Sequence, residues 1–567
     1  MPTSPEDAAP LLELRDLRTV FPLGGGRVLN AVDGVSFTLQ AGRTLCIVGE
    51  SGSGKSITAR SIMQIVGPPG RIAGGEIIYR PDAGRAPIDI ARLHPRGAVM
   101  RAIRGRDIAM IFQEPMTSLS PIHRIGWQIG EPLLAHRLAD RKAAHQRAIE
   151  LLRQVEIPNP QTAVDRYPFE FSGGMRQRAM IAMALACGPK ILIADEPTTA
   201  LDVTTQAEVL RLLMRLQHED GLALLFITHD MGVVAQIADD VLVMHQGQVV
   251  EHGPVERIFH DPQHPYTQRL LDASKKLGMA ASPARPVGTA QQPLLQVRGV
   301  TLTYPVQASL FGKPQVPPPA VRDVSFDLYE GENLGIVGES GSGKTSLGNC
   351  LIRILQPGVG QILYRRRDGI DVDLVALDRQ ALRQVHREIR MVFQDPFASL
   401  NPRMTVAQVI GEPLLMNGVL SGRALSQRVA ELLAQVGLPR DAGQRYPHAF
   451  SGGQRQRIVI ARALALNPRL IIADEATSAL DVTLRGQILD LLLELQRSLG
   501  LSFVLISHDL GVIRYFCNRI AVMYRGEIVE IGAADEICFK PRQAYTQALL
   551  AAVPEADPRR RNLLHAA

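Results

Sequence analysis

The sequence predicts an α/β protein built from two similar domains in tandem. Its 567 residues are too many for a single hydrophobic core. Six short motifs occur in the first half of the chain and return in the same order in the second. Within each half, short apolar runs such as LCIVG, ILIAD and LALLFI alternate with helical patterns such as RAIELLRQVEI. This alternation predicts buried parallel strands joined by helices.

The repeated motifs keep their order in both halves, which excludes a chance resemblance. They are GESGSGKS at 49–56 and GESGSGKT at 338–345, IFQEP at 111–115 and VFQDP at 392–396, FSGGMRQR at 171–178 and FSGGQRQR at 450–457, ILIADEP at 191–197 and LIIADEA at 470–476, ITHD at 227–230 and ISHD at 506–509, and PYTQ at 265–268 and AYTQ at 544–547. Two further runs, VLVMHQGQVV and IAVMYRGEIV, each predict a hairpin around a turn that contains glycine.

The domain boundaries follow from the repeat and from one change in composition. Residues 274–293 are rich in Ala, Pro, Gly and Gln and show no periodicity, which predicts a linker. The first domain therefore spans 1–273 and the second spans 294–567. A linker of this length stretches to about 66 Å, enough for the two domains to meet within one chain.

Composition excludes several classes of protein. The net charge of +6 is modest for this length, so nucleic acid is not an expected partner. No run of about 18 apolar residues predicts a transmembrane helix, and the N-terminus does not resemble a secretory signal, so we expect a cytosolic chain. The five cysteines (Cys46, Cys187, Cys350, Cys517 and Cys538) form no C-x-x-C pair, so we expect reduced thiols and no zinc site.

The first repeated motif predicts a phosphate-binding loop in each domain. It fits G-x-x-x-x-G-K-[ST], follows a predicted strand and precedes a predicted helix. Its glycines allow the backbone amides to point inward, where they and the helix N-terminus surround phosphate oxygens. The lysine reaches the β- and γ-phosphates of ATP, and the hydroxyl after it binds Mg²⁺. The residues are Gly49, Ser51, Gly52, Ser53, Gly54, Lys55 and Ser56 in the first loop, and Gly338, Ser340, Gly341, Ser342, Gly343, Lys344 and Thr345 in the second.

The fourth motif places two carboxylates at the end of a buried strand in each domain. Asp195 and Asp474 end the apolar runs, where they can hold Mg²⁺ directly or through water. Glu196 and Glu475 follow, and they point elsewhere because side chains alternate along a strand. We assign these glutamates to the attacking water, as general bases or as groups that orient it.

The FSGG motifs make the prediction more specific. They resemble the signature of the ATP-binding-cassette family, usually Leu-Ser-Gly-Gly-Gln, and the resemblance covers nearly the whole chain. It implies two P-loop NTPase domains, each with a RecA-like core, a helical signature subdomain and an antiparallel β region. It also implies that each signature completes the ATP site of the other cassette, so that two ATP molecules lie between the cassettes. Lys55 would then face Ser451, Gly452, Gly453 and Gln454, and Lys344 would face Ser172, Gly173 and Gly174.

The same resemblance assigns roles to further residues. It implies that Gln113 and Gln394 contact Mg²⁺ and the water, that His229 and His508 contact the γ-phosphate, that Asp202 and Asp481 lie in the loop connecting the two sites, and that Phe21 and Tyr304 stack on adenine. Phe171 and Phe450 replace the usual leucine, and Met175 replaces the usual glutamine of the first signature. Both halves keep the glutamate and the histidine, so we expect two competent sites.

Within the family, the chain resembles the ATPase of bacterial dipeptide and oligopeptide importers, with two subunits fused. Segments such as DPQHPYTQRLLDA and KPRQAYTQALLAA resemble the extension typical of that group. Only Cys538 lies there, where relatives often carry a cysteine cluster, so an iron–sulfur cluster is not expected. The resemblance implies two different permease subunits and an extracytoplasmic binding protein, at the cytoplasmic face of the inner membrane. The permeases would contact the segments after the two glutamines, one of which contains Trp127, for which we expect a packing role.

Two other functions agree with tandem cassettes. Translation factors that act on ribosomes usually have a long, charged helical linker, and repair ATPases carry C-x-x-C zinc modules; neither is present here. A non-catalytic nucleotide-binding scaffold is disfavoured by the intact glutamate and histidine in both halves. The sequence leaves the transported cargo open, since specificity would lie in other chains.

Overall fold

A computed structural model describes residues 9–81, 85–113, 118–199, 201–279, 292–305, 318–393, 395–478 and 480–561. The chain forms two compact units. The first contains residues 1–201, 205–274 and 554–567, and the second contains residues 202–204 and 275–553. None of the helices in the described ranges combines the length and the apolar character that crossing a bilayer requires.

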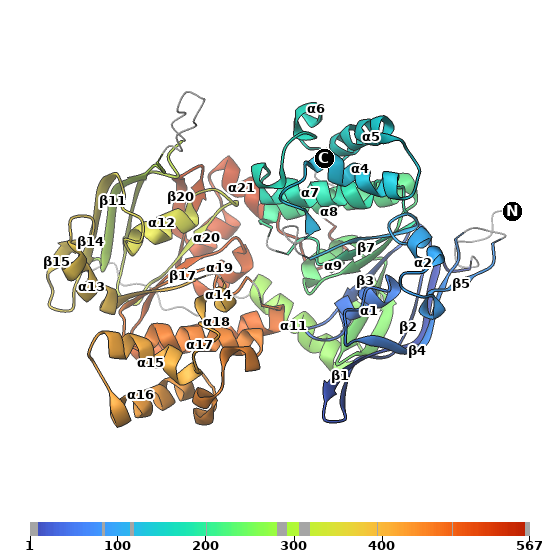
Figure 1. Cartoon of the computed structure of the whole chain (residues 1–567). Coiled ribbons are helices and arrows are strands. Elements are labelled where there is room, and N and C mark those ends of the chain that lie inside the picture. The colour runs from blue at the N-terminus through green and yellow to red at the C-terminus, as the bar shows by residue number, and fades with distance from the viewer. Residues whose placement is uncertain are drawn as a thin grey trace. The chain divides into compact units, whose positions relative to one another are not determined.

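The first unit contains two sheets and a group of helices (Figure 1). Its strands are β1 (Leu12–Gly24), β2 (Arg27–Leu39), β3 (Thr44–Val48), β4 (Arg71–Tyr79), β5 (Ile88–Asp89), β6 (Ile108–Ile111), β7 (Ile191–Asp195), β8 (Ala223–Ile227), β9 (Asp240–His245) and β10 (Gln248–Pro254). The helices are α1 (Lys55–Ile62), α2 (Ala98–Ile103), α4 (Ile125–Ala135), α5 (Arg141–Gln154), α6 (Pro160–Ala163), α7 (Gly173–Ala184), α8 (Val203–Asp220), α9 (Met231–Ile237), α10 (Val255–His260) and α11 (Pro265–Met279). Residues 203–204 of α8 and 275–279 of α11 are assigned to the second unit.

The six-stranded sheet of the first unit has the order β10-β9-β3-β8-β7-β6. All neighbouring strands are parallel except β9 and β10, which form the predicted antiparallel hairpin. Strands β3, β7 and β8 are buried along their whole length, as expected for short apolar runs covered on both faces. Their carboxyl ends lie at one edge of the sheet, which brings the loops after β3, β7 and β8 together.

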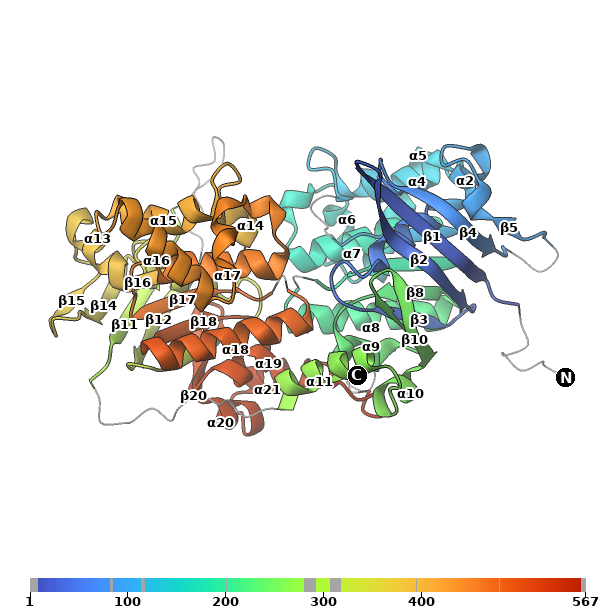
Figure 2. The same cartoon turned by 90° about the horizontal axis from the view of Figure 1, so that it is seen from below.

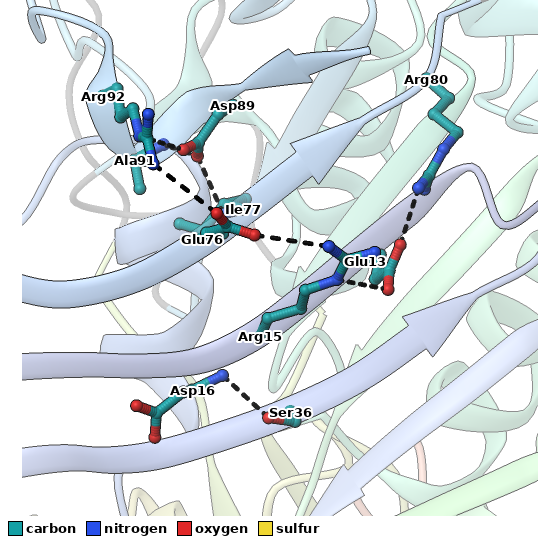
Figure 3. A network of polar contacts seen from close by, with 10 residues as sticks. All are labelled: Glu13, Arg15, Asp16, Ser36, Glu76, Ile77, Arg80, Asp89, Ala91 and Arg92. Carbon is teal, nitrogen blue, oxygen red and sulfur yellow. Dashed lines mark hydrogen bonds and ion pairs between the residues drawn. The ribbon is translucent and has the colours of Figure 1, made fainter.

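A second, antiparallel sheet of order β2-β1-β4-β5 packs on the first through a common apolar core. Its exposed face carries a chain of ion pairs between strands (Figure 3). Arg15 lies 2.7 Å from Glu13 and 3.5 Å from Glu76, and Arg80 lies 2.7 Å from Glu13. Such exposed pairs contribute little stability individually, but opposite charges on neighbouring strands favour the observed register of β1 against β4.

Helices α4, α5, α6 and α7 form the predicted helical subdomain of the first unit, and Figure 1 shows them apart from the antiparallel sheet. Figure 2 shows the same helices from below. The subdomain joins the six-stranded sheet between β6 and β7. Helix α7 starts directly after the FSGG serine, so the signature lies at a helix N-terminus.

The second unit repeats this plan. Its strands are β11 (Leu295–Leu302), β12 (Val321–Leu328), β13 (Asn333–Val337), β14 (Val359–Arg365), β15 (Asp371–Asp373), β16 (Ile389–Val392), β17 (Leu470–Asp474), β18 (Ser502–Ile506), β19 (Arg519–Tyr524) and β20 (Glu527–Ala533). Its helices are α12 (Lys344–Leu351), α13 (Arg379–Glu388), α14 (Pro396–Ser399), α15 (Val406–Met416), α16 (Gly422–Gln435), α17 (Gly452–Leu464), α18 (Val482–Leu499), α19 (Leu510–Phe516), α20 (Ala534–Phe539) and α21 (Ala544–Ala551).

The sheet orders of the second unit match those of the first element by element. The six-stranded sheet runs β16-β17-β18-β13-β19-β20 and the antiparallel sheet runs β12-β11-β14-β15. Helices α15, α16 and α17 form its helical subdomain (Figure 1). The fold class predicted from the sequence, two α/β domains with helical and antiparallel parts, is therefore confirmed. Residues 274–279, expected in the linker, are the last turns of α11, and most of the remaining linker lies outside the described residues.

Candidate functional site

The first phosphate loop connects β3 to α1 and is shaped by its glycines. Gly49 has φ 149° and Gly54, which precedes α1, has φ 101°. A Cβ on Gly49 would lie 2.2 Å from the carbonyl oxygen of Met244 at the end of β9, so only glycine fits this approach. The buried Lys55 donates from Nζ to the carbonyl oxygens of Gly49 (2.7 Å) and Glu50 (2.8 Å), which holds its ammonium inside the loop.

The second phosphate loop has the same geometry. A Cβ on Gly338 would lie 2.2 Å from the carbonyl oxygen of Met523, and Gly343 precedes α12 with φ 100°. Lys344 Nζ donates to the carbonyl oxygens of Gly338 (2.8 Å) and Glu339 (2.7 Å). Burial lowers the pKa of Lys344, although nearby carboxylates favour its charged form. The predicted loop residues therefore lie together at the start of a helix in both units.

A hydroxyl and a carboxylate meet beside each loop. Ser56 Oγ donates to Asp195 Oδ1 at 2.8 Å, and Thr345 Oγ1 donates to Asp474 Oδ1 at 3.2 Å. Burial raises the pKa of Asp195, and it raises the pKa of Asp474 to about 6. One carboxylate, one hydroxyl and phosphate oxygens form the hard-oxygen donor set that Mg²⁺ prefers, so these residues fit a magnesium ion.

Glu196 lies at the centre of a cluster in the first unit. Gln113 Nε2 donates to Glu196 Oε2 (2.9 Å), and Thr199 Oγ1 donates to the same oxygen (2.9 Å). His229 Nδ1 lies 3.4 Å from Glu196 Oε1. Burial alone would raise the pKa of Glu196, but the bonds to His229 and Thr199 and the charges of His229 and Lys55 lower it to about 2. The carboxylate is therefore ionised and oriented, as a group that positions or activates water must be.

The second unit places Glu475 in a similar cluster. His508 Nδ1 lies 3.2 Å from Glu475 Oε1. The bond to His508 and the charges of His508 and Lys344 lower the pKa of Glu475 and outweigh the opposite effect of burial. Ser478, which corresponds to Thr199, donates instead to the backbone oxygen of Glu475 (2.9 Å). Both glutamates adopt a positive φ, 48° at Glu196 and 47° at Glu475, which turns each side chain away from the strand it follows.

Each signature forms the N-terminus of a long helix in the helical subdomain. Ser172 caps α7, and its Oγ accepts from the amide of Met175 (3.3 Å). Ser451 caps α17 in the same way, and Gln454 adds a reciprocal bond, because its Oε1 accepts from the Ser451 amide (3.1 Å). These helix ends present amides and partial positive charge, which suits an anion.

The glycines of the signatures allow close packing. A Cβ on Gly174 would lie 2.5 Å from Thr205 Cγ2, and one on Gly453 would lie 3.2 Å from Leu484 Cδ1. Gly173 has open space beside it, and the nearest atom to a Cβ on Gly452 would be 3.9 Å away. The first glycine of each signature therefore leaves room for an approaching ligand.

The two aromatic residues expected at adenine have different surroundings. Tyr304 is 45% exposed, and its hydroxyl lies 3.0 Å from Ser346 Oγ at the start of α12. Phe21 packs against the loop before β4, where a Cβ on Gly70 would lie 2.4 Å from its ring. Tyr304 thus lies at the first turn of the helix that follows its phosphate loop, whereas Phe21 contacts the segment before β4.

The other predicted residues are placed as follows. Gln394 lies outside the described residues. Asp481 caps α18 by accepting from the Leu484 amide (2.9 Å), and Asp202 accepts from Thr204 Oγ1 (2.7 Å). Trp127, expected to pack, is 48% exposed and stacks on His123 with 4.3 Å between ring centroids.

Sequence reasoning missed three residues at these sites. Thr199 orients Glu196, and its only signal was its place three residues after the glutamate. Tyr266 and Tyr545 contact the phosphate loops, since their hydroxyls accept from the amides of Glu50 (2.9 Å) and Glu339 (3.1 Å). The repeat of PYTQ as AYTQ marked these tyrosines but did not show what they touch.

Comparison with protein families gives two matches, each found twice along the chain. The ABC transporter family matches residues 32–199 and 321–478. The family described as oligopeptide/dipeptide transporter, C-terminal region, matches residues 250–297 and 529–567.

Similar proteins extend over the full chain. The "Glutathione import ATP-binding protein GsiA" of Salmonella choleraesuis (strain SC-B67) and that of Escherichia coli (strain K12) are each 48% identical to it, over 99% of this chain and 92% of the relative. A solved structure of the ATP-binding cassette MJ0796 bound to ADP and Pi is 32% identical over 42% of this chain and 98% of that chain, with a TM-score of 0.37. The two ABC transporter matches and the full-length relatives show that the chain belongs to the ABC transporter family, as an ATP-hydrolysing, ATP-binding subunit that carries two cassettes in one polypeptide.

Proposed function

We propose that this chain is the ATPase of a bacterial importer of small peptides, a class that includes dipeptides, longer oligopeptides and glutathione. The observation that carries the proposal is the oligopeptide/dipeptide transporter C-terminal region, which follows both cassettes. The relatives described as glutathione import ATP-binding proteins support the direction of transport and a peptide-like cargo.

ATP and Mg²⁺ are the ligands of this proposal. The amides and lysine of each phosphate loop would hold the phosphates, and Ser56 with Asp195, or Thr345 with Asp474, would hold the metal. Mg²⁺ would neutralise charge on the transferred phosphoryl group. Gln113 belongs to the first cluster through its bond to Glu196, and Gln394 is assigned the same role in the second.

We propose that pairing of the two cassettes couples ATP binding and hydrolysis to transport. The Lys55 loop would be completed by the signature at 451–454, and the Lys344 loop by the signature at 172–174. Asp202 and Asp481 would connect the two sites, and Phe21 and Tyr304 would stack on adenine. Because ATP binds the paired state better than the open one, its binding and hydrolysis would shift the permeases between conformations. The partners are two permease subunits and, acting through them, an extracytoplasmic binding protein, at the cytoplasmic face of the inner membrane.

Two experiments test this function. Affinity purification of the tagged chain from detergent-solubilised cells should recover two different membrane permeases and a binding protein. Ribosomal proteins without membrane partners would contradict the importer. Uptake of labelled dipeptide, longer peptide and glutathione by the assembled transporter would then identify the cargo. Glu196→Gln and Glu475→Gln should each reduce uptake and ATP turnover strongly, whereas Glu219→Gln, an exposed carboxylate at the end of α8, should change neither.

A further inference from the structure

The PYTQ repeat places a tyrosine against each phosphate loop. In the first unit the amide of Glu50, the second residue of the loop, donates to the hydroxyl of Tyr266 at 2.9 Å. In the second unit the amide of Glu339 donates to the hydroxyl of Tyr545 at 3.1 Å. The contact thus occurs twice, at the same loop position, between segments more than 200 residues apart in the sequence.

Each tyrosine ring is fixed by an aromatic side chain at the end of a strand. The ring of Tyr266 lies 4.1 Å from that of His245, and the ring of Tyr545 lies 4.2 Å from that of Tyr524. The residue before each stacking partner lies close to the loop, since a Cβ on Gly49 would be 2.2 Å from the carbonyl oxygen of Met244 and a Cβ on Gly338 would be 2.2 Å from that of Met523. Loop, strand end and tyrosine therefore form one packed group.

The helix that presents each tyrosine is also fixed at its start. Glu251 on β10 accepts from the amides of Gln263 (2.8 Å) and His264 (3.1 Å), just before α11. Glu530 on β20 accepts from the amides of Arg542 (2.8 Å) and Gln543 (3.2 Å), just before α21. A carboxylate at a helix N-terminus satisfies free amides and stabilises the first turn, where the tyrosine lies.

The tyrosine hydroxyl suits this role chemically. Burial raises the pKa of Tyr545 to about 12, so its phenol is neutral at physiological pH and its oxygen accepts the amide bond without bringing a charge near the phosphates. The bonded amide belongs to the residue that precedes Ser51–Gly54, whose own amides would surround the phosphates of bound ATP. Fixing the backbone at Glu50 therefore limits the freedom of the amides that follow.

We propose that Tyr266 and Tyr545 are positioning residues of the ATPase, which hold the two phosphate loops in the conformation that binds ATP. Through them the region after each cassette becomes part of the nucleotide site. The proposal rests on ATP binding at the two loops and does not depend on the cargo.

The test uses the full chain with the double variant Tyr266→Phe/Tyr545→Phe, which removes both hydroxyls and keeps both rings. The matched control is Tyr364→Phe, because the buried Tyr364 hydroxyl donates to Glu388 Oε2 (3.0 Å) away from both loops. Amide hydrogen exchange of the peptides containing Glu50 and Glu339 is measured first, followed by KM for ATP and kcat.

We expect faster exchange of both loop peptides in the double variant and a KM for ATP raised about 3- to 10-fold, the effect of losing one neutral hydrogen bond at each site. We expect kcat to change less than about 2-fold, since the reacting groups stay in place. The control should show none of these changes. Faster exchange with an unchanged KM, an unchanged exchange rate, or an equal rise in KM in the control would each overturn the proposal. Loss of ATP hydrolysis in the unmodified chain would instead contradict the assignment of the ATP sites.

Discussion

Two glycines of one phosphate loop should respond very differently to the same substitution. Gly49 and Gly52 both have positive φ, 149° and 83°. A Cβ on Gly49 would lie 2.2 Å from the carbonyl oxygen of Met244 and 2.8 Å from Ser53 Oγ, whereas a Cβ on Gly52 would meet no atom within 4 Å. Alanine is therefore strained by the backbone conformation at both positions but clashes only at Gly49.

The magnitude follows from this difference. A non-glycine residue at positive φ costs about 1–2 kcal/mol, which applies to both variants. Overpacking against a group that cannot rotate away adds about 1–3 kcal/mol, and it applies to Gly49→Ala alone. The carbonyl of Met244 cannot yield easily, because it belongs to β9, which is paired with β3. If the extra cost appears in ATP binding, Gly49→Ala should bind about 5- to 140-fold more weakly than Gly52→Ala.

The assay is equilibrium binding of ATP to the full chain, with the second site disabled by Lys344→Ala. Thermal unfolding of the same variants measures any part of the steric free energy that destabilises the fold rather than weakening ATP binding. Gly338 and Gly341 repeat the geometry of the first pair, so the same contrast is expected there with the first site disabled. Equal affinity and equal stability of the two alanine variants would refute the steric argument.

Three further predictions concern the clusters around the loops. Thr199→Val should lower single-turnover hydrolysis at its site about 10-fold, because it removes a bond to the carboxylate of Glu196; Ser478→Ala removes a bond to a backbone oxygen and should cost less than about 3-fold. Met175→Gln should raise the free energy of unfolding by about 0.5–1 kcal/mol, because it completes the capping box seen in the second signature; unchanged thermal unfolding would contradict this. The lowered pKa of Glu196 (about 2) stabilises the fold by about 3 kcal/mol above the unfolded pKa of 4.5, and this stability should be lost as the pH falls from 4.5 toward 2. The measurement is the free energy of unfolding of the wild type and of Glu196→Gln at several pH values. If the difference between the two proteins did not change with pH, ionisation of Glu196 would not be the source of this stability.

The sequence predicted most of the fold because its signals are local and repeated. The fully buried strands β3, β7 and β8 were visible as short apolar runs, and the hairpin β9–β10 as the run VLVMHQGQVV with its glycine-containing turn. The start of the linker was harder to predict, since the run SKKLGM at 274–279 can continue a helix as readily as it ends one, and in the structure α11 extends to Met279.

The candidate site was predictable where a motif carries its own geometry. The positions of Lys55 and Ser56 follow from the motif, because the glycines that shape the loop and the start of α1 are their neighbours in the sequence. Tyr266 could not be placed in this way, because its contact with Glu50 depends on a helix more than 200 residues further along the chain. The surroundings of Phe21 were equally inaccessible, since they depend on how the loop before β4 packs.

The small differences between the cassettes give a way to test how the sites are assembled. In the first cassette Thr199 donates to the carboxylate of the glutamate, whereas Ser478 of the second donates to a backbone oxygen; in the second cassette Gln454 completes the capping box of the signature. If each loop pairs with the signature of the other cassette, as proposed, both favourable features fall in the Lys55 site and both unfavourable ones in the Lys344 site. If each loop instead paired with the signature of its own cassette, each site would have one favourable and one unfavourable feature. The two sites would then hydrolyse ATP at nearly equal rates. Single-turnover hydrolysis in Glu475→Gln, which reports the Lys55 site, should therefore be faster than in Glu196→Gln. Equal rates would argue against pairing between the cassettes, because they are what sites built within one cassette would give.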